Sequence, residues 1–215
     1  MAINSARTVK EHSPSLKIHL YTDQDSVDLQ YFDSVGMIKK PHVRSKVDYI
    51  HQSPFERTLY MDTDTKIVRD ISEMFRILDR FDLAIAHAHS RNRASTNQLW
   101  REDIPKGFPQ LNGGIILFNK NDKTQQLFKD WEKAFHANSF TKDQVTLREL
   151  IWLSDIRMYV LPPEFNIRYA KYLEIWEEEE ALPYILHYAS FNLKTEKPKI
   201  PKRQSFFSKI INKFK

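Results

Sequence analysis

Two aspartates, Asp62 and Asp64, are the residues of this sequence whose types and spacing best suit metal chemistry. They follow residues 59–61, a short apolar run that predicts a buried strand ending where the acids begin. Side chains alternate faces along an extended chain, so both carboxylates are expected to project the same way. Such a pair suits a Mg²⁺ or Mn²⁺ ion that also holds a diphosphate. The alternative is an Asp-rich turn without chemistry, because Asp and Thr are common turn residues.

A second stretch, Asn112-Gly113-Gly114, precedes another apolar run at residues 115–118. The chain has only four glycines, and two of them stand side by side here. Glycine lets the backbone approach another group closely, since it has no Cβ. We therefore expect a turn that feeds a buried strand and lines a site. A tight turn with no ligand remains the alternative.

The elements that must position these residues follow from hydrophobic periodicity. A polar stretch at residues 89–107 predicts a surface loop. Strands that alternate with helices predict an α/β fold with a largely parallel sheet. The expected helices are Ala2–His12, 44–52, 71–78, 123–137 and 143–152, and the expected strands are 16–21, 59–62, 81–86, 115–118 and 184–188.

Composition excludes several classes of protein. Hydrophobic residues make up 41% of the 215 residues, which supports a sizeable core, and there is no cysteine. Disulfides, thiolate nucleophiles and cysteine-based zinc sites are therefore excluded. Eight of the 33 basic residues but only one of the 28 acidic residues fall in residues 194–215. The positive charge thus belongs to a tail, which disfavours a nucleic-acid-binding face.

Taken together, the motifs in residues 1–198 resemble the nucleotide-sugar glycosyltransferases of the GT-A fold, especially family 8, which includes glycogenin and bacterial galactosyltransferases. The most specific match is Ser53-Pro54-Phe55-Glu56-Arg57-Thr58-Leu59-Tyr60-Met61-Asp62-Thr63-Asp64. The resemblance implies a metal-dependent enzyme. It would move a sugar, with retention, from a nucleotide-diphosphate donor (a UDP-sugar is expected) to a hydroxyl of a glycan or glycolipid.

The resemblance also implies roles for individual residues. A Mn²⁺ or Mg²⁺ ion would be held by Asp62, Asp64 and the late His187. Asp143 and Gln144 would act next to the anomeric carbon of the donor sugar. The residues implied to bind the donor are Arg44, Lys46, Asn112, Gly113, Gly114 and Lys194, the last of which stands one residue later than the lysine of the family.

Both ends of the chain depart from that family. The family's fold begins with a strand ahead of the helix at Ala2–His12, so we expect residues 1–198 to form a GT-A domain whose first strand is missing. Residues 199–215 place Phe206, Ile210 and Phe214 on one stripe and lysines on the other side, which predicts a basic amphipathic helix. We expect this tail to bind an anionic membrane and to place a cytoplasmic enzyme on the inner leaflet. Docking of the tail onto the body of the protein is the alternative.

Two other functions compete with the transferase. Asp62-Thr63-Asp64-Thr65 also fits the signature of phosphatases of the haloacid dehalogenase type, in which the first Asp is a nucleophile. That class needs a late Gly-Asp or Asp-Asp pair, and the sequence has neither. The second alternative is a non-catalytic module that binds a nucleotide sugar or a partner. Nucleoside diphosphate binding in the presence of Mn²⁺ would discriminate between these cases.

Overall fold

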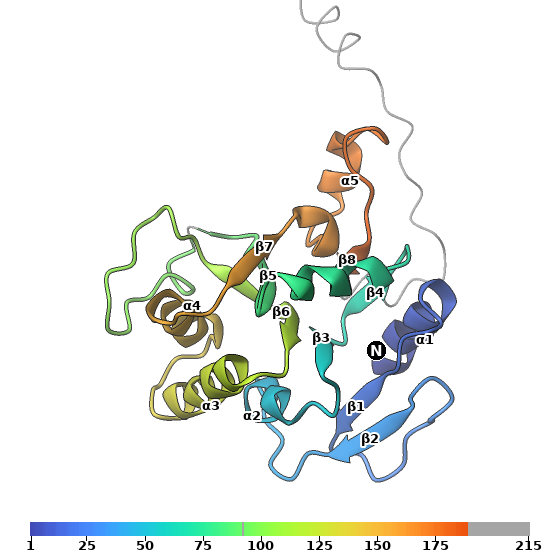
Figure 1. Cartoon of the computed structure of the whole chain (residues 1–215), viewed down its shortest axis with the longest axis horizontal. Coiled ribbons are helices and arrows are strands. Elements are labelled where there is room, and N and C mark those ends of the chain that lie inside the picture. Colours follow the sequence, from blue (N-terminus) through green and yellow to red (C-terminus); the bar gives the residue numbers. More distant parts are fainter. Residues whose placement is uncertain (92, 189–215) are drawn as a thin grey trace, which may run out of the picture.

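The computed structural model describes residues 1–91 and 93–188, which form a mixed α/β protein (Figure 1). No helix within these two ranges has the length and apolar character needed to cross a membrane. The α-helices are α1 (Ala2–His12), α2 (Lys46–Tyr49), α3 (Asp122–His136), α4 (Gln144–Leu153) and α5 (Lys171–Ile175), and the 3₁₀ helices are η1 (Ile50–Gln52), η2 (Ser72–Asp79) and η3 (Pro163–Phe165).

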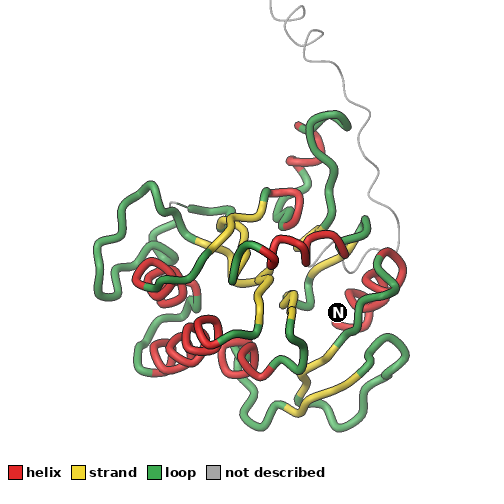
Figure 2. The backbone as a smooth tube through the Cα atoms, in the orientation of Figure 1, coloured by secondary structure: helices red, strands yellow, loops and turns green. Residues whose placement is uncertain are grey.

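The strands form three small sheets (Figure 2). The largest has the order β3-β6-β5-β7, while β1 pairs with β2 and β4 pairs with β8. Their bounds are β1 (His19–Thr22), β2 (Ser34–Met37), β3 (Arg57–Met61), β4 (Thr65–Ile67), β5 (Leu83–His87), β6 (Leu111–Asn119), β7 (Met158–Leu161) and β8 (Ile185–His187).

The prediction of a largely parallel sheet is wrong for the described chain. Strand β6 runs antiparallel to both of its neighbours, β3 and β5, and β4 runs antiparallel to β8. Only β1–β2 and β5–β7 are parallel ladders within these residues. The reason is that β5 is joined to β6 by a long loop with no crossover helix, and a direct return of the chain gives antiparallel pairing.

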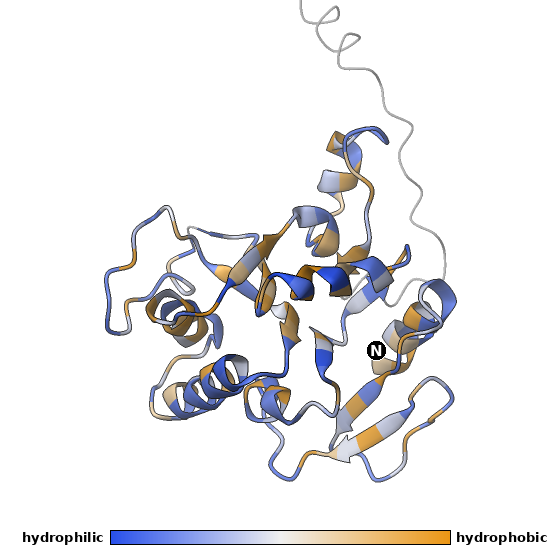
Figure 3. Cartoon of the chain, in the orientation of Figure 1, coloured by the Kyte–Doolittle hydropathy of each residue, from blue (hydrophilic) through white to orange (hydrophobic). Residues whose placement is uncertain are grey.

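Period-two alternation in β5 and β6 divides the core into two layers. Leu83 and Ile85 pack with Ile116 and Phe118 on the face that α3 and α4 cover, where Trp131 is fully buried. The intervening residues of both strands face η2, β4 and β8 on the other side. Figure 3 shows hydrophobic colour concentrated in the central strands, whereas α3 carries both colours. The two central strands of this sheet, β5 and β6, are therefore buried on both faces.

Local patterns predicted most elements but not their details. The helix Ala2–His12 is confirmed. The helix expected at residues 44–52 is the short α-helix α2 followed directly by the 3₁₀ helix η1. The helix expected at residues 71–78 is the 3₁₀ helix η2, which begins at Ser72. The loop expected at 89–107 contains no regular element among its described residues. Lys194 and the tail at residues 199–215, including its boundary with the domain, lie outside the described residues.

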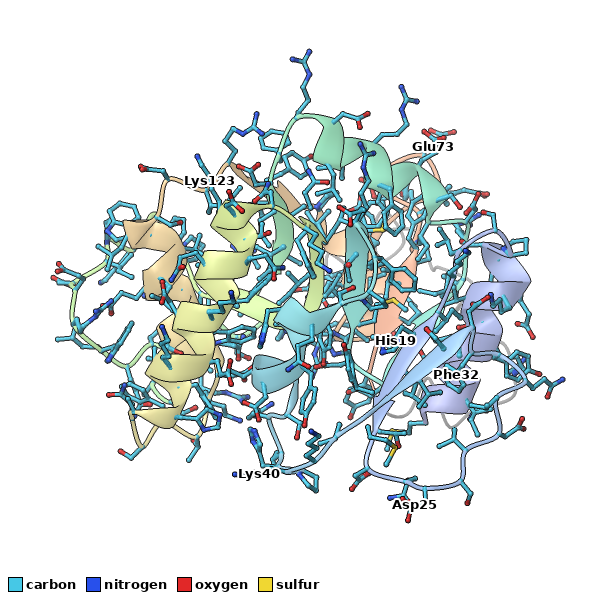
Figure 4. All side chains as sticks on the ribbon, turned by 60° about the horizontal axis from the view of Figure 1, so that its bottom comes forward. His19, Asp25, Phe32, Lys40, Glu73 and Lys123 are labelled. Atoms are coloured by element: carbon cyan, nitrogen blue, oxygen red, sulfur yellow. The ribbon has the colours of Figure 1, made fainter. Side chains whose placement is uncertain are left out.

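A large cavity separates β1 from β3. In the described chain each of these strands has a neighbour on one side only, β2 and β6 respectively. Both strands line a cavity of about 1120 Å³, together with α1. His19 and Phe32, labelled in Figure 4, line it from the side of the β1–β2 sheet. Protein interiors are normally close-packed, so a void of this size beside two strand edges is unusual.

Candidate active site

Strand pairing brings the two aspartates and the histidine together. Strand β3 ends at Met61, and Asp62-Thr63-Asp64 makes the turn into β4. The hydroxyl of Thr65 donates to the carbonyl of Asp62 at 2.8 Å and closes this turn. Because β4 pairs antiparallel with β8, Thr65 lies opposite His187. His187, which lies late in the sequence, is thus brought next to the turn because β8 pairs with β4.

The three side chains converge on one point. His187 Nε2 lies 3.2 Å from Asp64 Oδ1 and 3.6 Å from Asp62 Oδ2. One ligand atom from each residue lies within 4.8 Å of the others. The expected convergence of the carboxylates is therefore present, but its expected cause is wrong. The residues occupy a turn, so the curvature of the turn and not the alternation of a strand aims both carboxylates at His187.

The orientation of His187 is set by Asn166. His187 is 1% exposed, and its Nδ1 lies 2.6 Å from Asn166 Oδ1, to which it donates. The backbone around Ile167 runs beside β8 and forms a parallel bridge with Leu186, which positions Asn166. With its proton on Nδ1, the imidazole turns a lone pair at Nε2 toward the two carboxylates. That buried Nε2 has no hydrogen-bond partner within the described chain.

This donor set fits a divalent cation. Three electron-rich atoms face one another, an arrangement that repels unless a cation lies between them. Cis ligands at about 2.1 Å from Mg²⁺ stand roughly 3 Å apart, close to the separations between His187 Nε2 and the carboxylates. Two carboxylates and one imidazole also leave positions for diphosphate oxygens and water. Asp62, Asp64 and His187 are therefore able to hold the ion.

Gly114 lies directly behind these ligands. A Cβ built on Gly114 would lie 2.2 Å from His187 Cε1 and 2.6 Å from Asp62 Oδ2. The expected turn at Asn112-Gly113-Gly114 is wrong, because these residues lie inside β6 and none of them has a positive φ. The β5–β6 register shifts between Ile85 and His87, so the segment bulges out of the ladder. The predicted close approach is present: the backbone at Gly114 lies against the candidate metal ligands His187 and Asp62.

Lys46 is the buried cation of the site. Its side chain is 8% exposed, and its Nζ lies 3.2 Å from both Asp62 Oδ1 and Asp143 Oδ2. It also donates to the carbonyl of Gly113 at 2.9 Å. A charge so poorly hydrated is stable only because two carboxylates surround it. The short helix α2, which the predicted 44–52 segment contains, puts Lys46 there.

Asp143 and Gln144 lie at the start of α4, as the sequence predicts. Asp143 is 2% exposed, and Arg44 Nε lies 3.5 Å from its Oδ1. The indole of buried Trp131 donates to the carbonyl of Asp143 at 2.9 Å and anchors this end of the helix. Gln144 Nε2 donates to the carbonyl of Leu111 at the start of β6. Both side chains line the same small pocket as the metal-ligand candidates.

Charge pairing keeps the acids ionised. Burial by itself would raise the pKa of Asp62, but the Lys46 ammonium holds it well below its usual range. Burial, and then the charge of Asp62, raise the pKa of Tyr60, so its hydroxyl stays protonated and donates to Asp62 Oδ1 at 2.7 Å. Two carboxylates are thus available at neutral pH.

The pocket that these side chains line has a volume of about 230 Å³. Sequence reasoning missed three residues at this site: Tyr60, Asn166 and Arg168. Tyr60 could have been found, because it lies two residues before Asp62 on the same strand. Asn166 and Arg168, whose Nη1 is 3.8 Å from Asp64 Oδ2, gave no local signal. The pocket can bind an anionic ligand and a cation side by side.

Comparisons with known proteins identify a family and similar folds. The sequence profile of a family described as nucleotide-diphospho-sugar transferase matches residues 9–199. The crystal structure of the glycosyltransferase GlyE from Streptococcus pneumoniae TIGR4 is similar, with a TM-score of 0.57 and 18% identity over 99% of this chain. Its apo form gives a TM-score of 0.58 and 15% identity over the same share. The chain spans 57% and 56% of those two solved chains. None of the curated proteins matches it.

Proposed function

The chain belongs to the nucleotide-diphospho-sugar transferase family, and from that membership we propose that it is a metal-dependent glycosyltransferase. It moves a sugar from a nucleotide-diphosphate donor to a hydroxyl of a glycan or glycolipid. Mn²⁺ or Mg²⁺ is the cofactor, with Asp62, Asp64 and His187 as ligands. Membership does not support the alternative of a haloacid dehalogenase phosphatase.

One observation carries the proposal: the buried Nε2 of His187 has no hydrogen-bond partner among residues 1–91 and 93–188 and faces two carboxylates. A structural histidine at this depth would be expected to satisfy both ring nitrogens. Here Asn166 satisfies one of them, and the other is aimed at Asp62 and Asp64. This arrangement matches a metal-ligating histidine whose second nitrogen is held by a neighbour.

Each group of residues around the pocket has its own role in the proposed reaction. A bound divalent cation would offset the negative charge that develops on the departing diphosphate. Lys46 and Arg44 lie beside the same pocket and stabilise that charge further, since they act in a partly dehydrated site. Asp143 and Gln144, at the start of α4, orient the donor sugar. Asn112, Gly113 and Gly114 give the donor close access to the backbone, and Lys194 is proposed to reach the diphosphate.

Finer aspects of the proposal rest on the resemblance to glycosyltransferase family 8. They are transfer of a hexose, retention at the anomeric centre and a uridine diphosphate carrier. The GT-A type of domain over residues 1–198 belongs with them.

The test is Asp64→Asn, measured as Mn²⁺-dependent binding of uridine diphosphate and hydrolysis of UDP-sugars. We expect loss of metal-dependent turnover with the fold intact, because Asp64 lies in a turn outside the hydrophobic core and its side chain is 28% exposed. Asp155→Asn, which removes an exposed carboxylate elsewhere, is the control and should behave as wild type. Full activity of Asp64→Asn in chelator would refute the metal site. Tight uridine diphosphate binding by the wild type without any turnover would favour the non-catalytic alternative.

The tail at residues 199–215 is proposed to hold the enzyme on the inner leaflet of the cytoplasmic membrane. Its sequence combines an apolar stripe with lysines, and each cation near anionic lipid is worth about 1 kcal/mol. Deleting residues 205–215 should release the protein from anionic liposomes. Equal cosedimentation of the truncated and full-length chains would show that the tail is not an anchor.

A further inference from the structure

The small pocket beside the candidate metal ligands carries more positive than negative charge. Two aspartates line it, Asp62 and Asp143, and Asp64, which does not line it, lies 3.8 Å from Arg168, which does. No glutamate among the described residues lines it. The cationic side chains that line the pocket are Arg44, Lys46, Arg93, Lys142 and Arg168.

Three of these cations have acidic partners. Lys46 and Arg44 lie 3.2 and 3.5 Å from the carboxylate oxygens of Asp143. Arg168 lies 3.8 Å from Asp64. By contrast, no ion pair within residues 1–91 and 93–188 involves Arg93, from the loop after β5, or Lys142, just before α4.

Binding of the donor and the metal would not change this excess of positive charge in the pocket. A diphosphate that links two sugars carries one negative charge on each phosphate, so it offsets the charge of a divalent cation. Arg44, Lys46 and Arg168 are offset by the three aspartates. The charges of Arg93 and Lys142 therefore remain, and crowded like charges without counter-charge cost free energy that an anionic ligand would recover.

The side of the pocket near Arg93 also offers an aromatic wall. The rings of His89 and Tyr169 lie 3.7 Å apart at their centroids, and both residues line the pocket. Tyr172 holds His89 Nδ1 through its hydroxyl at 3.1 Å. Burial lowers the pKa of His89, and so do four nearby cations: Lys171, Arg168, Arg91 and Arg93. The neutral imidazole and the tyrosine ring are tilted by 59° to each other, so they form an angled aromatic surface on which one ring can pack against the apolar face of a sugar.

We propose that the acceptor is a saccharide that carries an anionic substituent (phosphate, sulfate or carboxylate), bound by Arg93 and Lys142. This inference rests on the proposed function, because the charge balance assumes a bound metal and donor diphosphate. It goes beyond that function by giving the acceptor a chemical class. The aromatic wall binds the sugar ring, and the two cations select the acidic group.

The experiment measures binding of probe sugars to protein saturated with Mn²⁺ and uridine diphosphate, so that no probe can occupy the diphosphate-binding part of the donor site. Glucose 6-phosphate and glucuronic acid are compared with glucose and with inorganic phosphate, by NMR titration. We expect both acidic sugars to bind at least about tenfold more tightly than glucose and than inorganic phosphate. Agreement between the phosphate and the carboxylate probe would show that charge, and not one substituent, is recognised.

Two double variants test whether Arg93 and Lys142 cause the preference for acidic sugars. Arg93→Gln/Lys142→Gln should remove the preference for acidic sugars while the affinity for Mn²⁺-uridine diphosphate changes by no more than about twofold. Lys106→Gln/Lys129→Gln removes the same charge from exposed positions that do not line the pocket, and it should keep the preference. A control variant that loses the preference equally would overturn the assignment to Arg93 and Lys142.

The outcomes separate the two proposals. If uridine diphosphate with Mn²⁺ does not bind at all, the proposed function fails, and this inference fails with it. If it binds but acidic sugars bind no better than glucose, only the anionic acceptor is refuted. If inorganic phosphate binds as tightly as glucose 6-phosphate, the site recognises an anion and not a saccharide, which also refutes the inference.

Discussion

Gly114 determines how closely strand β6 can approach the candidate metal ligands. Gly114→Ala places a methyl group where His187 and Asp62 now lie, at 2.2 and 2.6 Å from their nearest atoms. Since both are buried against other groups, we expect at least about a tenfold loss of Mn²⁺ affinity and a stability loss of about 1–3 kcal/mol from overpacking. Isothermal titration and urea unfolding measure the two effects.

Gly107→Ala is the matched control for this prediction. A Cβ at Gly107 meets nothing within 4 Å, so the same substitution should leave both Mn²⁺ affinity and stability near wild type. Unchanged Mn²⁺ binding by Gly114→Ala would contradict the placement of the ion beside β6.

Asn166 is predicted to position His187 without touching the ion. Asn166→Ala removes the acceptor that holds the Nδ1 proton, so His187 can adopt the other tautomer and lose its lone pair toward the aspartates. We expect Mn²⁺ affinity to fall about 10- to 100-fold. Asn166→Asp keeps an acceptor in the same place and should retain Mn²⁺ binding. Equal loss in both variants would indicate a packing role instead.

At the scale of elements, the Asp82–Arg157 pair joins the beginnings of β5 and β7. Asp82 is 4% exposed, and its carboxylate accepts from the Arg157 backbone at 3.1 Å and from its guanidinium at 3.0 and 3.2 Å. Asn121, the N-cap of α3, also donates to it at 3.1 Å. One carboxylate thus ties together two parallel strands and the start of a helix.

This pair predicts a loss of stability in acid. Hydrogen bonds from Arg157 lower the folded-state pKa of Asp82 below its value in the unfolded chain. Its contribution is therefore present above the unfolded pKa of about 3.9 and is lost as pH falls from there through the lowered folded pKa. Asp82→Asn should cost about 1.5–3 kcal/mol at pH 7 and reduce the slope of stability against pH in that acid window.

Urea unfolding between pH 2 and 7 measures this effect. Asp79→Asn is the control, because Asp79 pairs with Arg57 at 2.8 Å on the surface, where both side chains are about half exposed. Exposed pairs contribute roughly 0–1 kcal/mol. An acid slope that is the same in Asp82→Asn and wild type would refute the prediction.

At the scale of the whole molecule, the cavity between β1 and β3 is where a further strand would fit. Leu59 and Met61 of β3 are only partly buried and line this cavity, although their strand lies near the middle of the protein. The resemblance to GT-A glycosyltransferases implies a strand ahead of α1. A strand here would pair two free edges and cover apolar side chains, each worth about 1.5–3 kcal/mol when fully buried.

The prediction is tested by lengthening the chain with the residues encoded upstream of Met1. If they supply the strand, the longer chain should show a higher urea midpoint and weaker fluorescence of a dye that binds exposed apolar surface. The present chain should enhance that fluorescence under native conditions, because the cavity opens apolar side chains to solvent. No change in either measurement would rule out a strand in this cavity.

The sequence by itself determined the features that depend on local pattern. Helical periodicity placed α1, α3 and α4, and apolar runs placed β5 and β6, because both signals lie within one element. Residue chemistry selected Asp62 and Asp64 as candidate ligands, the resemblance to GT-A glycosyltransferases added His187, and the structure brings the three within reach of one another. Their role as ligands stays a prediction.

The tertiary structure decided what depends on pairing between distant segments. The direction of β6, the bulge at Gly113 and Gly114, and the place of Asn166 beside His187 all follow from ladders that join strands far apart in sequence. No local pattern encodes such a register, because it is chosen by the packing of the whole core. For the same reason the surplus charge of Arg93 and Lys142 became visible only when the fold gathered five cations around one pocket.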